Sequence, residues 1–198
     1  MLYALDIDGT LIRSFMRDEK CVRCGGKRRV LAASLAEGVK PVESDYVSCP
    51  DCVENYDRVE LLPGRAGRLW HLAKEDAHAR FALVTNQAGV AFGYQTKEQV
   101  GEKLARVTVA CAFFYGRPFS VHVAFGHPKA KVREYRDPEK VARRKPAPNM
   151  LYEAMESHGV GTPQTLYIGD LPTDMECAAA AGVTYIDAGA FFRDPSRA

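Results

Sequence analysis

Two aspartates stand two positions apart near the start of the chain, in the segment Asp6-Ile7-Asp8-Gly9-Thr10 that follows a short apolar run. Carboxylates with this spacing share one small volume, so one can attack an electrophile while the other moves a proton. Segments of this type also occur in ordinary turns, and the pair alone does not identify an active site. Its meaning depends on the other polar motifs of the chain.

Three further polar motifs carry complementary chemistry: Thr85–Gln87, Arg144–Pro146 and Gly169–Asp174. A hydroxyl and backbone N–H groups can bind phosphoryl oxygens, and a lysine can neutralise their charge. Two additional carboxylates, Asp170 and Asp174, can help to hold a hard divalent cation such as Mg²⁺, which prefers oxygen ligands. Together with Asp6 and Asp8, these groups are the parts needed to transfer a phosphoryl group to an aspartate.

The elements that must position these motifs alternate between strands and helices. Short apolar runs predict buried strands over residues 2–7, 81–85, 120–125, 165–168 and 183–187. Helical spacing and end signals predict helices over 64–79, 97 to about 114, 147–158 and 173–181; a capping box at Thr96 and Gln99 opens the second. Such alternation predicts an α/β fold with a mostly parallel sheet and helices on both faces. Ligands of these folds collect beyond the carboxyl ends of the strands, where the polar motifs stand.

The four motifs, in this order, resemble those of the haloacid dehalogenase superfamily, whose fold is Rossmann-like. The resemblance covers the whole chain except a cysteine-containing segment, residues 13–62. It implies core residues 1–12 and 63–198, with 13–62 as a zinc-binding cap or insertion, called the insertion segment below. It also implies a phosphatase rather than another activity, because members without the second aspartate generally perform other chemistry.

The roles that the resemblance implies can be stated residue by residue. Asp6 is the nucleophile, and Asp8 is the acid that protonates the leaving oxygen and then the base that activates water. Phosphoryl oxygens are bound by Thr85 and the Asn86 amide, and Lys145 neutralises charge. Arg144 contacts a second substrate phosphate or the leaving group, or is simply solvated. The implied Mg²⁺ ligands are the Asp6 carboxylate, the Asp8 backbone carbonyl and the Asp170 carboxylate, with Asp174 as a ligand or a support.

The substrate stays open at this stage. The run from Thr85 to Val100 resembles histidinol-phosphate and heptose-bisphosphate phosphatases, and the run from Gly116 to Pro128 also resembles the phosphatase domain of polynucleotide kinase/phosphatase. A small phosphorylated metabolite of sugar, histidinol or nucleotide type is the first expectation. A 3′-phosphate at a DNA or RNA end is the alternative, and a non-catalytic zinc-ribbon binding module is the second alternative.

Six cysteines are unevenly placed. Cys21, Cys24, Cys49 and Cys52 form two CxxC pairs, which indicate four thiolates around one Zn²⁺ in an intracellular chain and a disulfide framework in a secreted one. Cys111 and Cys177 lie in apolar helical runs and are expected to fill the core. The related sugar and histidinol enzymes commonly carry a zinc loop between their second and third motifs. Here that interval retains only His127-Pro128 as a possible remnant.

Three roles are open for the zinc ribbon of the insertion segment. It covers the strand ends as a cap that recognises substrate, or it contacts nucleic acid, or it is a structural staple or dimer contact. The nucleic-acid reading depends on a basic stretch that holds Arg23, Lys27, Arg28 and Arg29.

Length, composition and charge limit the class of protein to which the chain can belong. The chain has 198 residues, 46% apolar and 26% charged, which suits one globular domain with a small insertion. Its net charge of +2 identifies no partner, although a basic strip over 127–145 is suited to guiding an anionic substrate. No apolar run is long enough for a membrane helix and the N-terminus does not resemble a signal peptide, so a cytoplasmic location without membrane contact is expected. The oligomeric state is left open.

Overall fold

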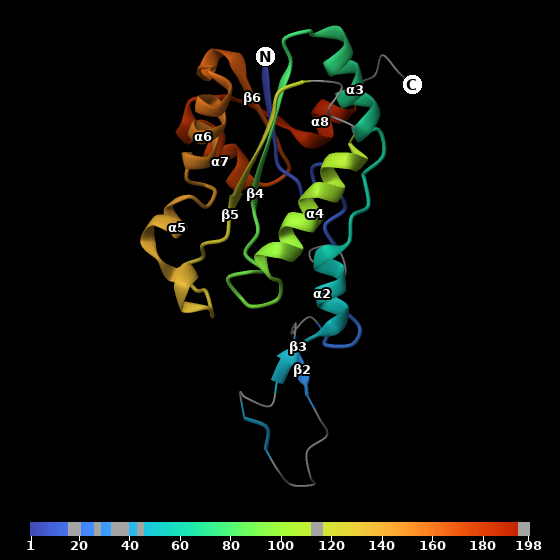
Figure 1. The fold of residues 1–198 in the computed structure, drawn as a ribbon, viewed down its shortest axis with the longest axis vertical. Coiled ribbons are helices and arrows are strands. Elements are labelled where there is room, and N and C mark those ends of the chain that lie inside the picture. Colours follow the sequence, from blue (N-terminus) through green and yellow to red (C-terminus); the bar gives the residue numbers. More distant parts are fainter. Residues whose placement is uncertain (16–20, 26–28, 33–39, 43–45, 112–116, 194–198) are drawn as a thin grey trace.

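A five-stranded sheet forms the middle of the molecule in the computed structural model, which describes residues 1–15, 21–25, 29–32, 40–42, 46–111 and 117–193 (Figure 1). Its order is β5-β4-β1-β6-β7, and every neighbouring pair is parallel. The strands are β1 (Leu2–Leu5), β4 (Arg80–Asn86), β5 (Phe119–Ala124), β6 (Thr165–Gly169) and β7 (Thr184–Asp187). The predicted α/β fold with a parallel central sheet is confirmed.

Helices cover both faces of this sheet. One face carries α3 (Arg65–Glu75), α4 (Lys97–Ala110) and α8 (Ala188–Phe192), and the other carries α6 (Asn149–His158) and α7 (Pro172–Ala181). Along β1, Tyr3 and Leu5 belong to the first apolar layer and Leu2 and Ala4 to the second. Since both faces are buried, these strands appear in the sequence as continuous apolar runs.

The remaining elements are short. They are α2 (Pro50–Asp57), α5 (Pro138–Ala142), two 3₁₀ helices (Arg133–Arg136 and Thr162–Gln164), and a separate antiparallel pair, β2 (Arg29–Leu31) and β3 (Tyr46–Ser48). The sequence analysis did not predict α2, α5 or α8, because helices of five to eight residues contain too few apolar repeats to show a period. No described helix is long and apolar enough to cross a membrane.

Two predicted helix ends differ from the structure. The helix expected to reach residue 79 ends at Glu75, and the helix expected to reach about 114 ends at Ala110 with Cys111 as its C-cap. Residues 112–116 lie outside the described part of the chain. The capping box is confirmed: Thr96 Oγ1 accepts from the Gln99 N–H at 3.2 Å, and Gln99 Oε1 accepts from the Thr96 N–H at 2.8 Å.

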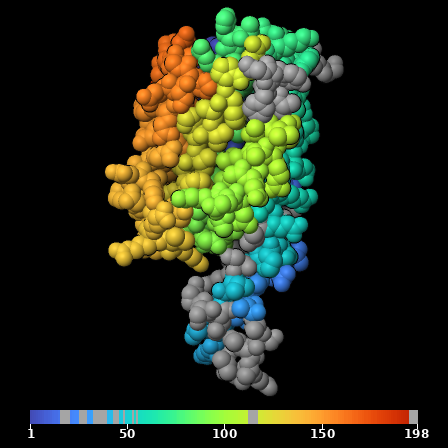
Figure 2. All heavy atoms as spheres, in the orientation of Figure 1, coloured from blue at the N-terminus to red at the C-terminus, as the bar shows by residue number. Residues whose placement is uncertain are grey.

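The insertion segment leaves and re-enters the core at neighbouring points. Ile12 pairs with Leu61 in an antiparallel bridge, and the N–H of Leu62 donates to the Leu11 carbonyl at 2.9 Å. Beyond this stem, α2 packs against α4. Figures 1 and 2 show that β2 and β3 project away from the five-stranded sheet, beyond α2. The boundaries 13 and 62 stay predictions.

Candidate active site and thiol cluster

The predicted motifs converge at the carboxyl ends of the strands, as parallel topology requires. Asp6 follows β1, Thr85 and Asn86 end β4, and Asp170 follows β6. Asp6, Thr85 and Asn86 line a cleft of about 450 Å³, and Asp170 lies outside its lining. Its lining consists of Asp6, Asp8, Arg13, Ser14, Phe15, Tyr56, Thr85, Asn86, Gln87, Ala88, Gly89, Phe92, Lys103, His127, Arg144, Lys145, Leu171 and Thr173.

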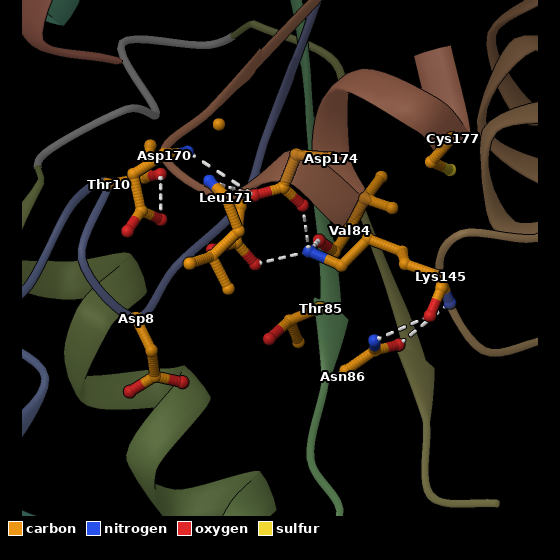
Figure 3. Close-up of polar contacts among 12 residues, drawn as sticks. Asp8, Thr10, Val84, Thr85, Asn86, Lys145, Asp170, Leu171, Asp174 and Cys177 are labelled. Carbon is orange, nitrogen blue, oxygen red and sulfur yellow. Dashed lines mark hydrogen bonds and ion pairs between the residues drawn. The ribbon is translucent and has the colours of Figure 1, made fainter. Parts of the chain in front are cut away.

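Lys145 lies between two buried carboxylates at the cleft (Figure 3). Its Nζ lies 2.6 Å from an oxygen of Asp6 and 2.6 Å from an oxygen of Asp174, and it donates to the Val84 carbonyl at 3.3 Å. Burial by itself lowers the pKa of Lys145, but the two carboxylates more than reverse this and raise it. Burial raises the pKa of Asp6 to about 7, with Asp174 adding to the rise and Lys145 opposing it. Asp6 is therefore a desolvated carboxyl beside a fixed positive charge.

Asp174 is fully buried, and both of its oxygens are engaged. One accepts from the Tyr167 hydroxyl at 2.9 Å and contacts Lys145, while the other accepts from the N–H groups of Asp170 at 3.2 Å and Leu171 at 3.0 Å. This geometry favours Asp174 as the support that fixes Lys145 and the 170–171 turn, rather than as a direct metal ligand. Gly169 is required here because a Cβ would stand 2.5 Å from that of Asp174.

A cation site fits beside Asp6. Carboxylate oxygens of Asp6, Asp170 and Asp174 lie within 4.8 Å of one another, and the Thr10 hydroxyl donates to Asp170 at 3.1 Å, which orients that carboxylate. Hard oxygen donors in this number and spacing match what Mg²⁺ prefers. Since Asp174 is already engaged, Asp6 and Asp170 are the side chains placed to contact the ion.

Asp8 is held by two groups that the sequence analysis did not assign. The Lys103 ammonium lies 2.8 Å from one carboxylate oxygen, and Gln87 Nε2 donates to the other at 2.7 Å and to the Thr85 hydroxyl at 2.9 Å. In Figure 3 the Asp8 carboxylate points toward α4, away from Lys145. The Lys103 side chain is only 3% exposed. A sequence clue existed, since Lys103 shares the apolar face of α4 with Val100.

The Asn86 side chain contacts Lys145, whereas the Arg144 side chain lines the cleft. The Asn86 side chain accepts from the Lys145 N–H at 3.0 Å and donates to the Lys145 carbonyl at 3.2 Å, so it positions Lys145, and the binding of a phosphoryl oxygen by the Asn86 amide stays a prediction. Arg144 lines the cleft, and its Nη1 is buried without a hydrogen-bond partner in the described part of the chain. Burial lowers the pKa of Arg144. A desolvated guanidinium with an unsatisfied donor is suited to binding an anion.

Among the lysines and arginines of the basic strip over 127–145, Arg144 and Lys145 are the two that line the cleft. Lys140 contacts Glu134 at 2.7 Å and Arg143 contacts Glu153 at 2.6 Å, whereas Arg144 and Lys145 line the cleft. His127 lines it too, with Nδ1 accepting from the Lys129 N–H at 3.0 Å. Within the described residues, His127 belongs to neither group of side chains with metal-ligand spacing.

The four paired cysteines form one cluster, called the thiol cluster here: Cys21, Cys24, Cys49 and Cys52. Cys21 and Cys49 have their sulfurs 3.6 Å apart, and Cys24 and Cys52 have theirs 3.5 Å apart. All six cysteines lie in the described residues and are free thiols. Four sulfurs around a tetrahedral Zn²⁺ at about 2.3 Å would stand about 3.8 Å from one another, so the cluster has the right size for the ion.

The described residues of the insertion segment lie partly at the cleft and partly around the thiol cluster. Four of its described residues line the cleft, namely Arg13, Ser14, Phe15 and Tyr56, and none belongs to β2 or β3. Arg23, from the predicted nucleic-acid patch, contacts Asp51 at 3.2 Å. Lys27 and Arg28 lie outside the described residues.

Comparisons with known proteins agree with this geometry. A family model described as haloacid dehalogenase-like hydrolase matches residues 137–188. A D-glycero-D-manno-heptose-1,7-bisphosphate 7-phosphatase from Chlorobaculum tepidum is 32% identical over 138 residues, which cover 64% of this chain and 64% of that protein. The chain therefore matches less than two thirds of that relative's length.

Solved structures show the same fold. A D,D-heptose 1,7-bisphosphate phosphatase from B. bronchiseptica, complexed with magnesium and phosphate, aligns with a TM-score of 0.58 at 20% identity over 93% of this chain and 78% of that one. A haloacid dehalogenase-superfamily hydrolase from Geobacter sulfurreducens aligns with a TM-score of 0.52 at 18% identity over 94% and 88%. Motifs, fold and relatives agree, and the chain is similar to haloacid dehalogenase-like hydrolases.

Proposed function

We propose that the protein is a Mg²⁺-dependent phosphatase that hydrolyses a small phosphorylated metabolite of sugar type through an aspartyl-phosphate. The observation that carries the proposal is the buried Asp6–Lys145–Asp174 group with Asp8 in the same cleft. The heptose-bisphosphate phosphatase that resembles this chain supports a sugar phosphate over the histidinol and nucleotide types.

The residues perform a two-step displacement in this proposal. An Asp6 oxygen attacks phosphorus, the bond to the leaving oxygen breaks, and Asp8 gives that oxygen its proton. Asp8 then takes a proton from water, whose oxygen attacks the aspartyl-phosphate, releases inorganic phosphate and restores Asp6. Lys145 and the buried Thr85 hydroxyl bind phosphoryl oxygens as charge develops on them.

The Asp6 and Asp170 carboxylates would hold Mg²⁺, together with the Asp8 backbone carbonyl. When bound, the ion neutralises phosphoryl oxygens and helps to align the substrate. Asp174 contributes indirectly, because it fixes Lys145 and the turn that carries Asp170.

Arg144 supports a substrate with a second anionic group. Its Nη1 is buried at the cleft and lacks a partner among the described residues, and an unsatisfied buried donor is costly unless a ligand binds it. A bisphosphate, or another phosphomonoester with a second anion, would satisfy it.

We also propose that the thiol cluster binds Zn²⁺, supported by its four convergent sulfurs. Four free thiols persist in a reducing compartment, which supports the proposal that the protein is cytoplasmic.

The test is a Mg²⁺-supported phosphatase screen that contains sugar mono- and bisphosphates and a 3′-phosphorylated oligonucleotide. Sugar phosphates should be turned over fastest, and Asp6→Asn should abolish turnover and trapping of the beryllium fluoride adduct, because an amide is a poor nucleophile. Preference for the oligonucleotide would replace the substrate proposal. Folded, Mg²⁺-saturated protein without turnover of any substrate would favour a non-catalytic binding module.

A further inference from the structure

Four aromatic rings form a continuous row beside the cleft, called the aromatic row here. Tyr56 stacks on Tyr94 with ring centroids 5.8 Å apart, Tyr94 stacks on Phe92 at 5.9 Å, and Phe92 meets His127 at 4.9 Å. Tyr56, Phe92 and His127 line the cleft itself. The row joins three separate parts of the chain: α2 of the insertion segment, the loop after β4 and the loop after β5.

The end of α2 that carries Tyr56 is fixed to the core. The side chain of its neighbour Asp57 accepts from Gln95 Nε2 at 2.8 Å and from Gln99 Nε2 at 3.4 Å. Arg106 of α4 donates to the Asp57 backbone carbonyl at 2.6 Å. The position of the Tyr56 ring is therefore set by hydrogen bonds to α4 and to the segment before it.

Gly89 lets the Tyr56 ring approach the core closely. A Cβ at residue 89 would stand 3.3 Å from Tyr56 Cε1 and 2.6 Å from Gln95 Oε1, so any larger residue would disturb both contacts. The ring therefore lies directly against the loop that follows the Thr85–Gln87 motif.

The chemistry of the cleft separates into two regions. Phosphoryl-binding groups gather around Lys145, whereas Phe15, Tyr56 and Phe92 supply large apolar surface to the same cleft. When the phosphoryl group is bound at Asp6, the leaving group must lie in the other part of the cleft, where these aromatic side chains are. Aromatic faces bind rings that present a flat, weakly polar surface, such as the CH face of a pyranose or the face of a nucleobase.

We propose that the aromatic row is the leaving-group subsite, and that Tyr56, delivered by the insertion segment, is a specificity-determining residue that packs against a ring of the substrate. The inference rests on the proposed phosphatase function and adds the chemical class of the leaving group. It also gives the insertion segment a direct part in substrate choice through α2, separate from the projecting β2–β3 pair.

The experiment compares three phosphomonoesters: glucose 6-phosphate, adenosine 5′-monophosphate and acyclic glycerol 3-phosphate. The measured quantity is kcat/KM for the preferred ring substrate divided by kcat/KM for glycerol 3-phosphate. Tyr56→Ala should lower this ratio by roughly tenfold, the scale of one lost stacking contact, and the change should lie mainly in KM. Tyr56→Phe should keep the ratio, since the ring remains. The ring substrate whose kcat/KM falls more in Tyr56→Ala identifies the sugar or the base as the occupant of the subsite.

Tyr152→Ala is the matched control, because Tyr152 is an exposed tyrosine on α6 outside the cleft lining. It should leave the ratio at the wild-type value. A wild-type ratio in Tyr56→Ala, or an equal fall in the control, would overturn the subsite while leaving the phosphatase intact. No turnover by the wild type of these three substrates or of any phosphomonoester in the screen described above would overturn the proposed function and this inference with it.

Discussion

At the scale of single residues, Lys103 is the finding with the most direct mechanistic consequence. A lysine side chain that is 3% exposed costs free energy unless it is paired, and its contact is the carboxylate of Asp8 at 2.8 Å. Lys103 and Gln87 each hold one Asp8 oxygen. We infer that Lys103 is a positioning residue that sets the orientation from which Asp8 approaches the leaving oxygen.

Lys103→Met should therefore weaken acid catalysis. The loss of kcat should be large for an alkyl phosphate, up to the roughly 10²–10⁴-fold that general acid–base groups contribute, and small for nitrophenyl phosphate, whose leaving group needs little protonation. Lys103→Arg should recover part of the loss. Equal losses on the two substrates, measured on variants with wild-type circular dichroism, would exclude this role.

At the scale of elements, β5 and α6 are joined by a polar cluster remote from the cleft. The Ser120 hydroxyl lies 2.9 Å from His122 Nε2 and 3.0 Å from His158 Nε2, and His122 Nδ1 lies 3.3 Å from a Glu153 oxygen. Burial lowers the pKa of His122, with Arg143 adding to this effect and Glu153 opposing it. Burial also lowers the pKa of His158, helped by Arg80. Both imidazoles are thus favoured in the neutral form by the folded state.

The sign of the resulting pH dependence follows from proton linkage. As pH falls below about 6.5, the unfolded chain binds protons at these histidines before the folded protein does, so their contribution lowers the free energy of unfolding. The buried Asp6, with its raised pKa, acts in the opposite direction. Urea titrations of wild type and His122→Gln at pH 7 and pH 5.5 separate the two, because Asp6 is common to both proteins.

The wild type should lose more stability than His122→Gln over this interval, by up to about 1 kcal/mol, the scale of one pH unit of linkage for a single site. Identical pH slopes in the two proteins would show that His122 titrates alike in the folded and unfolded states.

At the scale of the whole molecule, the core and the insertion segment are held together by different interactions. The sheet has an apolar layer on each face, with residues such as Leu5, Phe81 and Tyr167 almost fully buried. In the described part of the insertion segment, the separate buried cluster consists of the cysteines with Val30 packed against them. So small a cluster cannot fold on apolar burial alone, which supports the Zn²⁺ site proposed above.

Purified protein should accordingly contain about one zinc per chain, by the four-thiolate rule, as measured by elemental analysis after dialysis that removes Mg²⁺. Cys49→Ser should lose the zinc and retain the cooperative thermal transition of the core. Turnover of nitrophenyl phosphate should largely survive, while turnover of the ring substrate preferred by the wild type should fall. Protein purified under reducing conditions without zinc, and with paired disulfides, would contradict the metal site.

The sequence by itself determined the parallel α/β sheet and the convergence of its motifs. Runs buried on both faces and the capping box at Thr96 are local patterns, and parallel strands bring their carboxyl ends to one edge. Asp6, Asp8 and Thr85 could therefore be expected in one place from the sequence, whereas Lys145 follows no strand and was expected there from the resemblance of the motif set.

Only the tertiary structure decided which side chains contact one another there. Lys103 reaches Asp8 across 95 positions, the Asn86 side chain binds the Lys145 backbone, and Tyr56 enters the cleft from a helix that the sequence analysis missed. Residue types and spacing specify which groups arrive at an edge of the sheet. The rotamers and partners of those groups depend on how distant segments pack and on which buried charges must be neutralised, and no local pattern in the chain contains that information.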